Sequence, residues 1–293
     1  MRVLVISRGA WNCVNNTGNT MQNFFAGCEE LELHNLYLRA ELPSDNPCKS
    51  IFRITEKELV SNIKKRNRLP GEEVSNHVVA SEENDWEKKV YGKAKTSNSY
   101  TLWIARELMW SFAKWRNSKL DEYLDKIKPQ VVFMPVFGCW YPHKILKYIH
   151  KRTGAKIILF HADDNFSLKQ FSLSPAYWIH RLRLRSWVRK SVRLSSVNYC
   201  ISNLQVEEYS KAFGVECKLL QKFISEEDEP CAKSNALPVR MVYTGNIEMN
   251  RWKTLSTITT ATTLSATGFT TIPRTNRVYM PPMFCSWTWA ATS

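Results

Sequence analysis

The segment Arg2-Val3-Leu4-Val5-Ile6-Ser7 gives the clearest indication of the fold class. Its apolar residues, Val3 to Ile6, form a continuous β-rich run, which is typical of a strand buried on both faces of a parallel sheet. A polar turn that contains Gly18-Asn19-Thr20 follows, and residues 21–26 then have a helical pattern. A strand, a glycine-containing turn and a helix N-terminus together indicate an α/β sheet.

The same alternation continues along the chain. We expect strands at 31–38, 131–136, 155–160, 197–201 and 217–220, and helices at 101–127, 142–151, 175–194 and 204–213. The apolar face of the first of these helices consists of Leu102, Ala105, Leu108, Met109, Phe112 and Trp115, at three- and four-residue steps. Residues 41–100 are highly charged and weakly periodic, and we interpret them as a peripheral region with some helix. The pattern predicts a doubly wound, Rossmann-like parallel sheet.

A change of composition divides the chain. Residues 1–224 form the predicted first domain, and 225–238 have the acids and prolines of a linker. Residues 239–255 begin a second α/β domain, but 256–293 form an aberrant Thr-rich tail without sustained periodicity, which we expect to be poorly ordered. Too few residues remain to complete a second domain. A reading-frame change or premature stop explains this tail, and a natural Thr-rich tail is the alternative.

Composition limits the function and the location. The 293 residues include 41 Lys and Arg against 27 Asp and Glu, a net charge of +14, which favours anionic partners. The 8 cysteines have no metal-binding spacing and are typical of buried thiols in a reducing compartment. No apolar run is long enough for a signal peptide or a spanning helix. We therefore expect a cytoplasmic protein, with or without a membrane-facing surface.

The order of these elements resembles a known family. The stretch Arg2 to Ser7, the Gly18-Asn19-Thr20 turn, a strand ending in His161-Ala162-Asp163-Asp164, then Tyr199 to Asn203, and finally Tyr243-Thr244-Gly245-Asn246 follow one another. This series resembles bacterial GT-B glycosyltransferases of the large retaining group that builds capsule, O-antigen and exopolysaccharide. The block from Phe166 to Pro175 is similar to a segment of capsule-cluster members. The resemblance covers residues 1–255.

The resemblance implies a function for each domain. The first would bind a saccharide or lipid-linked acceptor, the second would bind a nucleotide sugar, and no metal or other cofactor is implied. The family's second domain carries a Glu-x7-Glu element that holds the donor. No acidic residue follows Glu248 here, so that element is absent. The chain is therefore either a glycosyltransferase or a truncated, non-catalytic remnant that binds a membrane or a partner.

Three groups of residues are candidates for the glycosyltransferase site. His161, Asp163 and Asp164 end a buried strand, where an imidazole or carboxylate would orient or deprotonate an acceptor hydroxyl. Gly18, Asn19 and Thr20 precede a helix whose backbone N–H groups suit a phosphate or polar acceptor. For both groups the alternative is helix capping or a plain turn. The resemblance implies that Gly245, Asn246, Arg251 and Lys253 bind the donor diphosphate, although Asn246 replaces the arginine of many relatives.

The helix predicted at 175–194 is strongly basic and contains tryptophans. A helix of this kind can lie on an anionic membrane, with Trp178, Arg181, Arg185, Trp187 and Arg189 facing the lipid. The alternative is a helix that packs on the sheet and exposes a solvated basic face. Nucleic acid is the least favoured partner, because no recognised binding module accompanies the basic patch. We expect His143, His150 and His180 to be solvated on helix surfaces.

Overall fold

The computed structural model describes residues 1–12, 16–44, 46–74, 100–222, 253, 256–257, 265–271 and 285–290. The chain forms two compact units, of which the first contains Met1–Cys13 and Thr20–Lys222. The second contains Val14–Asn19 and Phe223–Ser293. The whole predicted linker, 225–238, lies outside the described residues, as does the predicted start of the second domain, 239–255, apart from Lys253.

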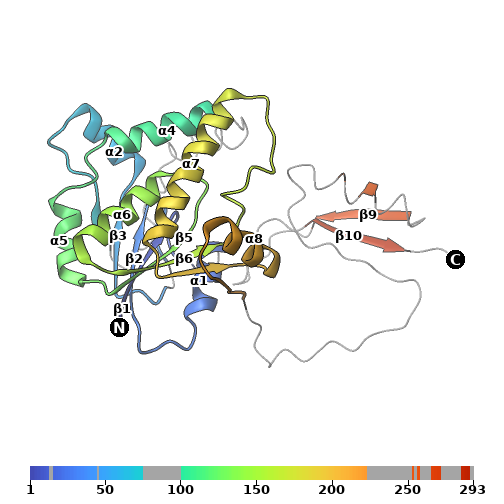
Figure 1. Cartoon of the computed structure of the whole chain (residues 1–293), viewed down its shortest axis with the longest axis horizontal. Coiled ribbons are helices and arrows are strands. Elements are labelled where there is room, and N and C mark those ends of the chain that lie inside the picture. The colour runs from blue at the N-terminus through green and yellow to red at the C-terminus, as the bar shows by residue number, and fades with distance from the viewer. Residues whose placement is uncertain are drawn as a thin grey trace. The chain divides into compact units, whose positions relative to one another are not determined.

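An eight-stranded sheet forms the centre of the first unit, in the order β4-β3-β2-β1-β5-β6-β7-β8 (Figure 1). The strands are β1 (Arg2–Ser7), β2 (Glu32–Tyr37), β3 (Ser50–Arg53), β4 (Glu72–Val74), β5 (Val131–Pro135), β6 (Lys156–His161), β7 (Val197–Cys200) and β8 (Cys217–Leu219). Every pair is parallel except β3 with β4. The strand order reverses between β1 and β5, as the predicted doubly wound sheet requires.

Apolar layers cover both faces of the sheet. On β1, Leu4 and Ile6 belong to one buried cluster, whereas Val3 and Val5 belong to the other. The prediction of a strand buried on both faces is therefore confirmed. The helices are α1 (Asn16–Phe25), α2 (Glu56–Lys64), α4 (Tyr100–Phe112), α5 (Ser118–Ile127), α6 (Tyr141–Thr153), α7 (Pro175–Leu194) and α8 (Asn203–Phe213). Residues of α2 and α4 to α8 join the first cluster, and Met21 of α1 joins the second.

Local sequence signals begin and end several of these helices. Thr55 and Glu58 form a reciprocal capping box at the start of α2, and the side chain of Ser202 caps α8. Gly154 and Gly214 end α6 and α8 with φ angles of 69° and 70°, in the left-handed region that favours glycine. The helix ends predicted at these two glycines are confirmed.

Two parts of the predicted order are wrong. Helix α1 begins at Asn16, so Gly18, Asn19 and Thr20 lie inside the helix and not in a turn before it. The described part of the region 41–100 contains the expected helix, α2, and also two strands, β3 and β4, that the sequence interpretation leaves out. Both strands are short, and β4 contributes Glu72 and Glu73 at the edge of the described sheet. Charged residues are common on edge strands, where they hide the alternation that marks a strand.

The predicted apolar face of the helix at 101–127 is confirmed only in part, because Trp115 is buried and Met109 packs against the same cluster. Leu102, Leu108 and Phe112 are exposed, with relative accessibilities of 48%, 47% and 63%. The buried residues of α4 are instead Glu107 and Trp110. A helical repeat predicts which residues share a face, but not which face meets the rest of the protein.

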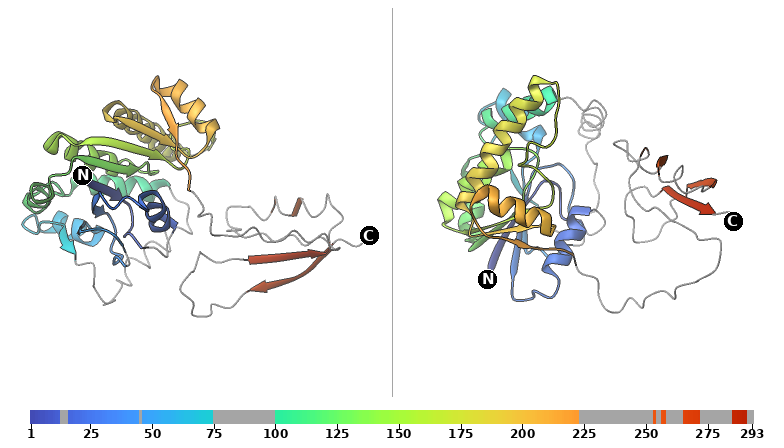
Figure 2. Two further views of the ribbon diagram at one scale, coloured as in Figure 1. Left: turned by 90° about the horizontal axis from the view of Figure 1, so that it is seen from below. Right: turned by 45° about the vertical axis from the view of Figure 1, so that its right-hand side comes forward.

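The second unit contains an antiparallel pair of strands, β9 (Ser265–Thr271) and β10 (Cys285–Ala290), both drawn in red in Figure 2. They lie in the Thr-rich tail, for which the sequence indicates no regular element. Threonine and aromatic residues favour strands even where no alternation is sustained. Among the described residues, no helix is both long and apolar enough to cross a bilayer. Five cysteines whose side chains are described are free thiols: Cys28 is exposed, and Cys48, Cys139, Cys200 and Cys217 are buried.

Candidate functional site

The reversal of strand order indicates a candidate site at the carboxyl ends of the central strands, and this end of the sheet is called the candidate edge. β1 pairs with β5, and β5 pairs with β6, so the segments that follow these three strands begin at the same edge. Open α/β sheets bind ligands at the carboxyl ends of the strands beside such a reversal. Asn165 joins two of the segments, because its Nδ2 atom donates a hydrogen bond of 2.9 Å to the carbonyl of Val136. A Cβ atom on Gly138 would lie 3.2 Å from Asn165 Oδ1, so the segments approach closely.

His161 is the last residue of β6, but its side chain is not accessible to solvent at this edge. Its side chain is fully buried, and its ring lies 5.1 Å from that of Tyr209 and 5.9 Å from that of Phe213 in α8. The Nε2 atom is 3.5 Å from Asn198 Oδ1. Burial lowers the pKa of His161 to about 4, so the ring is neutral at pH 7. The prediction that His161 acts on a substrate in the crevice is not compatible with this burial.

Asp164 organises the loop after β6. Its Oδ1 atom accepts hydrogen bonds from the backbone of Ser167 at 2.8 Å and of Phe166 at 3.2 Å, and from the Tyr209 hydroxyl at 3.0 Å. Burial alone would raise the pKa of Asp164, but the hydrogen bonds from Ser167, Tyr209 and Phe166 outweigh it and lower this pKa. The carboxylate therefore holds a turn in the loop after β6. It does not cap the following helix, because α7 begins at Pro175.

Asp163 differs from its neighbour. Its carbonyl accepts from Gln205 Nε2 at 3.3 Å, whereas the residue as a whole is exposed. Its carboxylate has no hydrogen-bond partner within the described part of the chain. Of the three residues predicted at the end of β6, Asp163 is the one with a carboxylate available to a ligand.

The other candidates for acceptor and donor binding are less defined. Gly18 is buried in α1, Asn19 is exposed, and Thr20 is half-buried. Gly245, Asn246 and Arg251 lie outside the described residues. Lys253 is exposed, and its carbonyl accepts a hydrogen bond of 3.0 Å from Thr257 Oγ1. Donor binding by these residues stays a prediction.

Arg181 is not on an outward-facing surface of α7, contrary to the expectation from the sequence. Only 7% of the residue is accessible. Its guanidinium donates hydrogen bonds to the carbonyls of Ser167 at 2.9 Å and of Asp164 at 3.0 Å. Arg181 therefore fastens α7 to the loop after β6, where buried carbonyls need donors.

The next arginines on this flank are progressively more exposed. Arg185 is half-buried, donates to the Phe166 carbonyl at 2.6 Å and lies 3.9 Å above the Phe166 ring. Arg189 is exposed, and its guanidinium is 5.4 Å from the same ring. Burial lowers the pKa of Arg185, and the charges of Arg189 and Arg181 lower it further. Like charges four residues apart repel one another on a helix, and α7 contains no acidic residue to offset them.

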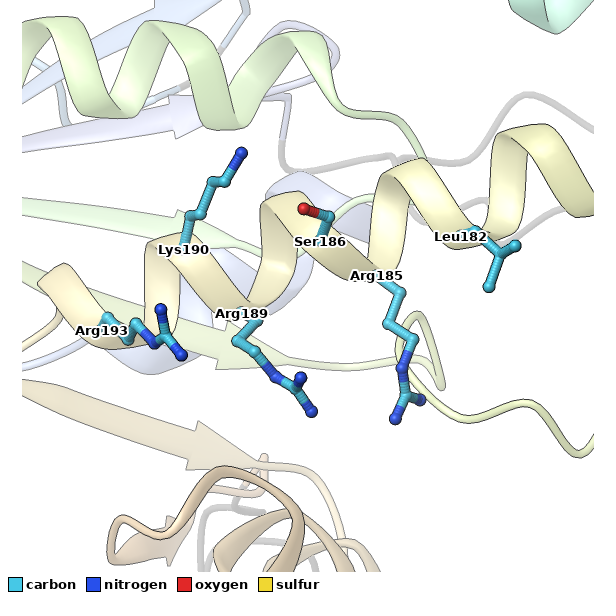
Figure 3. A pocket seen from close by; sticks show the side chains of 6 residues that line it. All are labelled: Leu182, Arg185, Ser186, Arg189, Lys190 and Arg193. Atoms are coloured by element: carbon cyan, nitrogen blue, oxygen red, sulfur yellow. The ribbon is translucent and has the colours of Figure 1, made fainter.

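A shallow hollow of about 270 Å³ lies along this part of α7. Figure 3 shows Arg185, Arg189 and Arg193 projecting from one flank of the helix, whereas Lys190 projects from the other. Trp187 is half-buried on α7, with Lys190 Nζ 4.8 Å and Lys144 Nζ 5.9 Å from its ring. Trp178 is also half-buried, and its Nε1 atom donates to the Ser172 carbonyl at 2.7 Å. The ring of Trp187 is thus flanked by two lysines, exposed Lys190 and half-buried Lys144.

Two of the histidines expected in solvent are buried. His143 is fully buried, with Nδ1 2.8 Å from Ser191 Oγ, and burial lowers its pKa to about 3. His180 is packed against Trp103 and Trp140, and burial lowers its pKa to about 4. His150 is half-buried and lies 2.8 Å from the Ala155 carbonyl. Imidazole is tolerated inside proteins when it is neutral.

The sequence interpretation misses Arg8, which stands at the candidate edge. Arg8 is half-buried and follows β1 directly, and its Nε atom is buried without a hydrogen-bond partner. The available signal was its position, because a polar residue after the first buried strand lies where ligands bind in such sheets. Within the described residues, no group of three or more His, Cys, Asp and Glu side chains is placed to hold a metal ion.

The fold defines a class: an α/β domain with Rossmann-like alternation around one mixed, mostly parallel sheet. No protein-family model matches the chain, and no curated protein matches it significantly.

Proposed function

We propose that this chain derives from a retaining GT-B glycosyltransferase that transfers a sugar from a nucleotide sugar to a saccharide or lipid-linked acceptor in cell-surface polysaccharide biosynthesis. The strand-order reversal between β1 and β5 is the observation that carries the proposal. It places the segments after β1, β5 and β6 at one edge, as an acceptor site on the first domain requires. The ordered motifs of the sequence support the choice of this family over other α/β enzymes.

Within this proposal, Asp163 orients or deprotonates the acceptor hydroxyl, because its carboxylate is exposed and uncommitted. Asp164 and Arg181 hold the loop that positions it, through the carbonyls and amides described above. His161 contributes packing beneath α8. Residues 239–255 would bind the donor diphosphate only as part of a complete second domain.

Calorimetric titration with UDP and UDP-glucose tests this proposal. The chain should be compared with a restored version, in which a complete second domain replaces residues 239–293. We expect the restored version to bind both ligands and to transfer sugar, and we expect Asp163→Asn to abolish transfer while Asp125→Asn, an exposed acid on α5, leaves it unchanged. A restored version that neither binds a nucleotide nor transfers sugar would overturn the glycosyltransferase proposal.

A second candidate is a non-catalytic remnant that binds an anionic membrane from its cytoplasmic side. Helix α7 combines exposed cations with exposed apolar side chains, and this combination favours the second candidate. The cations are Arg189 and Arg193. The apolar residues are Ile179 and Leu182, which are 58% and 52% accessible. Cations attract acidic headgroups, and apolar side chains enter the interface. This candidate predicts co-sedimentation with phosphatidylglycerol vesicles but not with phosphatidylcholine vesicles.

Two variants and one competitor distinguish the outcomes. Arg189→Gln combined with Arg193→Gln should reduce vesicle binding, whereas Arg2→Gln, at the amino end of β1, should not. Equal binding to neutral and acidic vesicles would contradict the membrane candidate. Tight, steeply salt-dependent binding to a single-stranded oligonucleotide would favour nucleic acid as the partner instead.

A further inference from the structure

Arg8 begins the segment that follows β1, at the reversal of strand order. The turn is fixed by buried groups, because Ser7 Oγ donates to the Gly9 carbonyl at 2.8 Å. Asn35 Nδ2 in turn donates to Ser7 Oγ at 2.9 Å. These hydrogen bonds therefore hold the backbone from which the Arg8 side chain extends.

The positive charge of Arg8 acts on buried groups at the start of α6. Burial raises the pKa of the Cys139 thiol to about 11, and the positive charge of Arg8 is the strongest influence that opposes this rise. Arg8 and Arg106 also oppose the rise that burial imposes on the pKa of Tyr141. Arg106 is neutralised by an ion pair with Glu56. Arg8 has no such pair within the described residues.

This lack of a partner separates Arg8 from the other buried or half-buried arginines within the described residues. Polar or ionic partners are present for Arg2, Arg53, Arg66, Arg106, Arg152, Arg181 and Arg185. Glu41 is the acid beside Gly9, but its carboxylate pairs with Arg39 at 3.2 Å. A partly buried guanidinium without acceptors costs free energy, and an anion bound against it removes that cost.

We propose that Arg8 anchors a binding site for a diphosphate group at the sheet edge between β1 and β5. The planar guanidinium offers paired N–H donors that match the oxygen atoms of a phosphate. The site lies where open α/β sheets bind their ligands. Which diphosphate binds here rests on the proposed function. The ligand is a prenyl diphosphate if this unit binds a lipid-linked acceptor, or a nucleoside diphosphate if the unit also contacts the donor.

Calorimetric titration of the full chain tests this site, with inorganic pyrophosphate, geranyl diphosphate and UDP as three separate probes. We expect at least one probe to bind, and Arg8→Gln to weaken that binding about 10-fold or more, as the loss of charge-assisted hydrogen bonds requires. Arg8→Lys should give an intermediate affinity, because lysine keeps the positive charge but lacks the paired N–H donors of the guanidinium. Arg2→Gln, on the same strand at the opposite edge, should bind as the wild type does.

Melting temperatures of the Arg8 variants distinguish anion binding by Arg8 from a purely structural role of this residue. Arg8→Gln should melt at or above the wild-type temperature without ligand, because it removes an unneutralised charge. A large loss of stability in Arg8→Gln that Arg8→Lys does not share, without any probe binding to the wild type, would overturn the proposal. So would binding that Arg189→Gln weakens and Arg8→Gln does not, since the anion would then occupy α7.

The probes also separate this inference from the proposed function. Pyrophosphate binding through Arg8 without sugar transfer by the restored version would leave the anion site intact and refute the glycosyltransferase. Transfer of sugar that Arg8→Gln does not slow, with unchanged affinity for all three probes, would refute the Arg8 site alone.

Discussion

Glu107 of α4 caps the start of α6, because its Oε1 atom accepts a hydrogen bond of 2.6 Å from the backbone N–H of Trp140. Its Oε2 atom accepts a second hydrogen bond, of 3.0 Å, from the backbone N–H of Tyr141. Trp140 provides no side-chain cap of its own. A carboxylate from a neighbouring helix therefore satisfies the free N–H groups and the positive end of the helix dipole.

Replacement of Glu107 should destabilise the protein. A glutamine has one acceptor oxygen, so its amide group would face one of the two N–H donors. We expect Glu107→Gln to lower the free energy of unfolding by about 1–3 kcal/mol at pH 8, measured by urea denaturation. Glu207→Gln, an exposed acid on α8, should change it by less than about 0.5 kcal/mol. Equal stability of the two variants would contradict the capping role.

Acid should destabilise the fold through its buried histidines. The lowered pKa values of His143, His161 and His180 mean that the unfolded chain takes up protons below pH 6.5 while the folded chain does not. Stability is therefore fully present above pH 6.5 and falls toward pH 4. Each histidine should cost about 2 kcal/mol by pH 5, at about 1.4 kcal/mol per pH unit.

His161→Phe isolates one of these contributions, because a phenyl ring fits the same aromatic surroundings. Its free energy of unfolding should fall less steeply with acid than that of the wild type. Glu107 acts in the opposite direction: burial raises its pKa to about 7, so its contribution to stability increases as pH falls from 7 toward 4.5. That contribution is present in both proteins and cancels in the comparison. Identical pH profiles would show that His161 is not buried.

Gly71 should not tolerate a side chain. Its φ angle is +101°, and a Cβ atom would lie 2.7 Å from two ring carbons of Phe52. We expect Gly71→Ala to cost about 2–4 kcal/mol from backbone strain and overpacking together. Gly154 also has a positive φ angle, of +69°, but nothing lies within 4 Å of its Cβ position. Gly154→Ala should therefore cost only about 1 kcal/mol in thermal or urea unfolding.

Arg181 and Arg189 should respond differently to the same substitution. Arg181→Gln leaves the carbonyls of Ser167 and Asp164 without their donor, so we expect a loss of about 2–3 kcal/mol. Arg189→Gln removes a like charge from an exposed flank and should change stability by less than about 0.5 kcal/mol. Urea denaturation of both variants checks this, and a stable Arg181→Gln would show that α7 needs no such attachment.

The exposed face of α4 gives a further contrast. Leu108→Ser and Phe112→Ser should each cost less than about 1 kcal/mol, because both side chains are already solvent-accessible. Trp110→Ala should cost about 3–5 kcal/mol, since Trp110 is fully buried and its ring stacks 4.3 Å from that of Tyr141. Thermal unfolding measures all three. A large loss from Phe112→Ser would mean that this face is covered.

Elements with local signals could be predicted from the sequence alone. The apolar run Val3 to Ile6 is buried on both faces of the sheet because no polar residue interrupts it. Gly154 and Gly214 end their helices because glycine enters the left-handed region at little cost. The alternation of such elements was sufficient to predict a doubly wound, mostly parallel sheet.

Which side chains are accessible depends on how the elements pack together. His161 and Asp163 end the same strand, yet α8 covers the first and leaves the second exposed. Arg181 and Arg189 share one flank of α7, but the loop after β6 reaches only the first with its carbonyls. The face of α4 that packs inward contains Glu107, because the N-terminus of α6 offers donors there. Burial depends on contacts between residues far apart in the chain, and no local repeat encodes them.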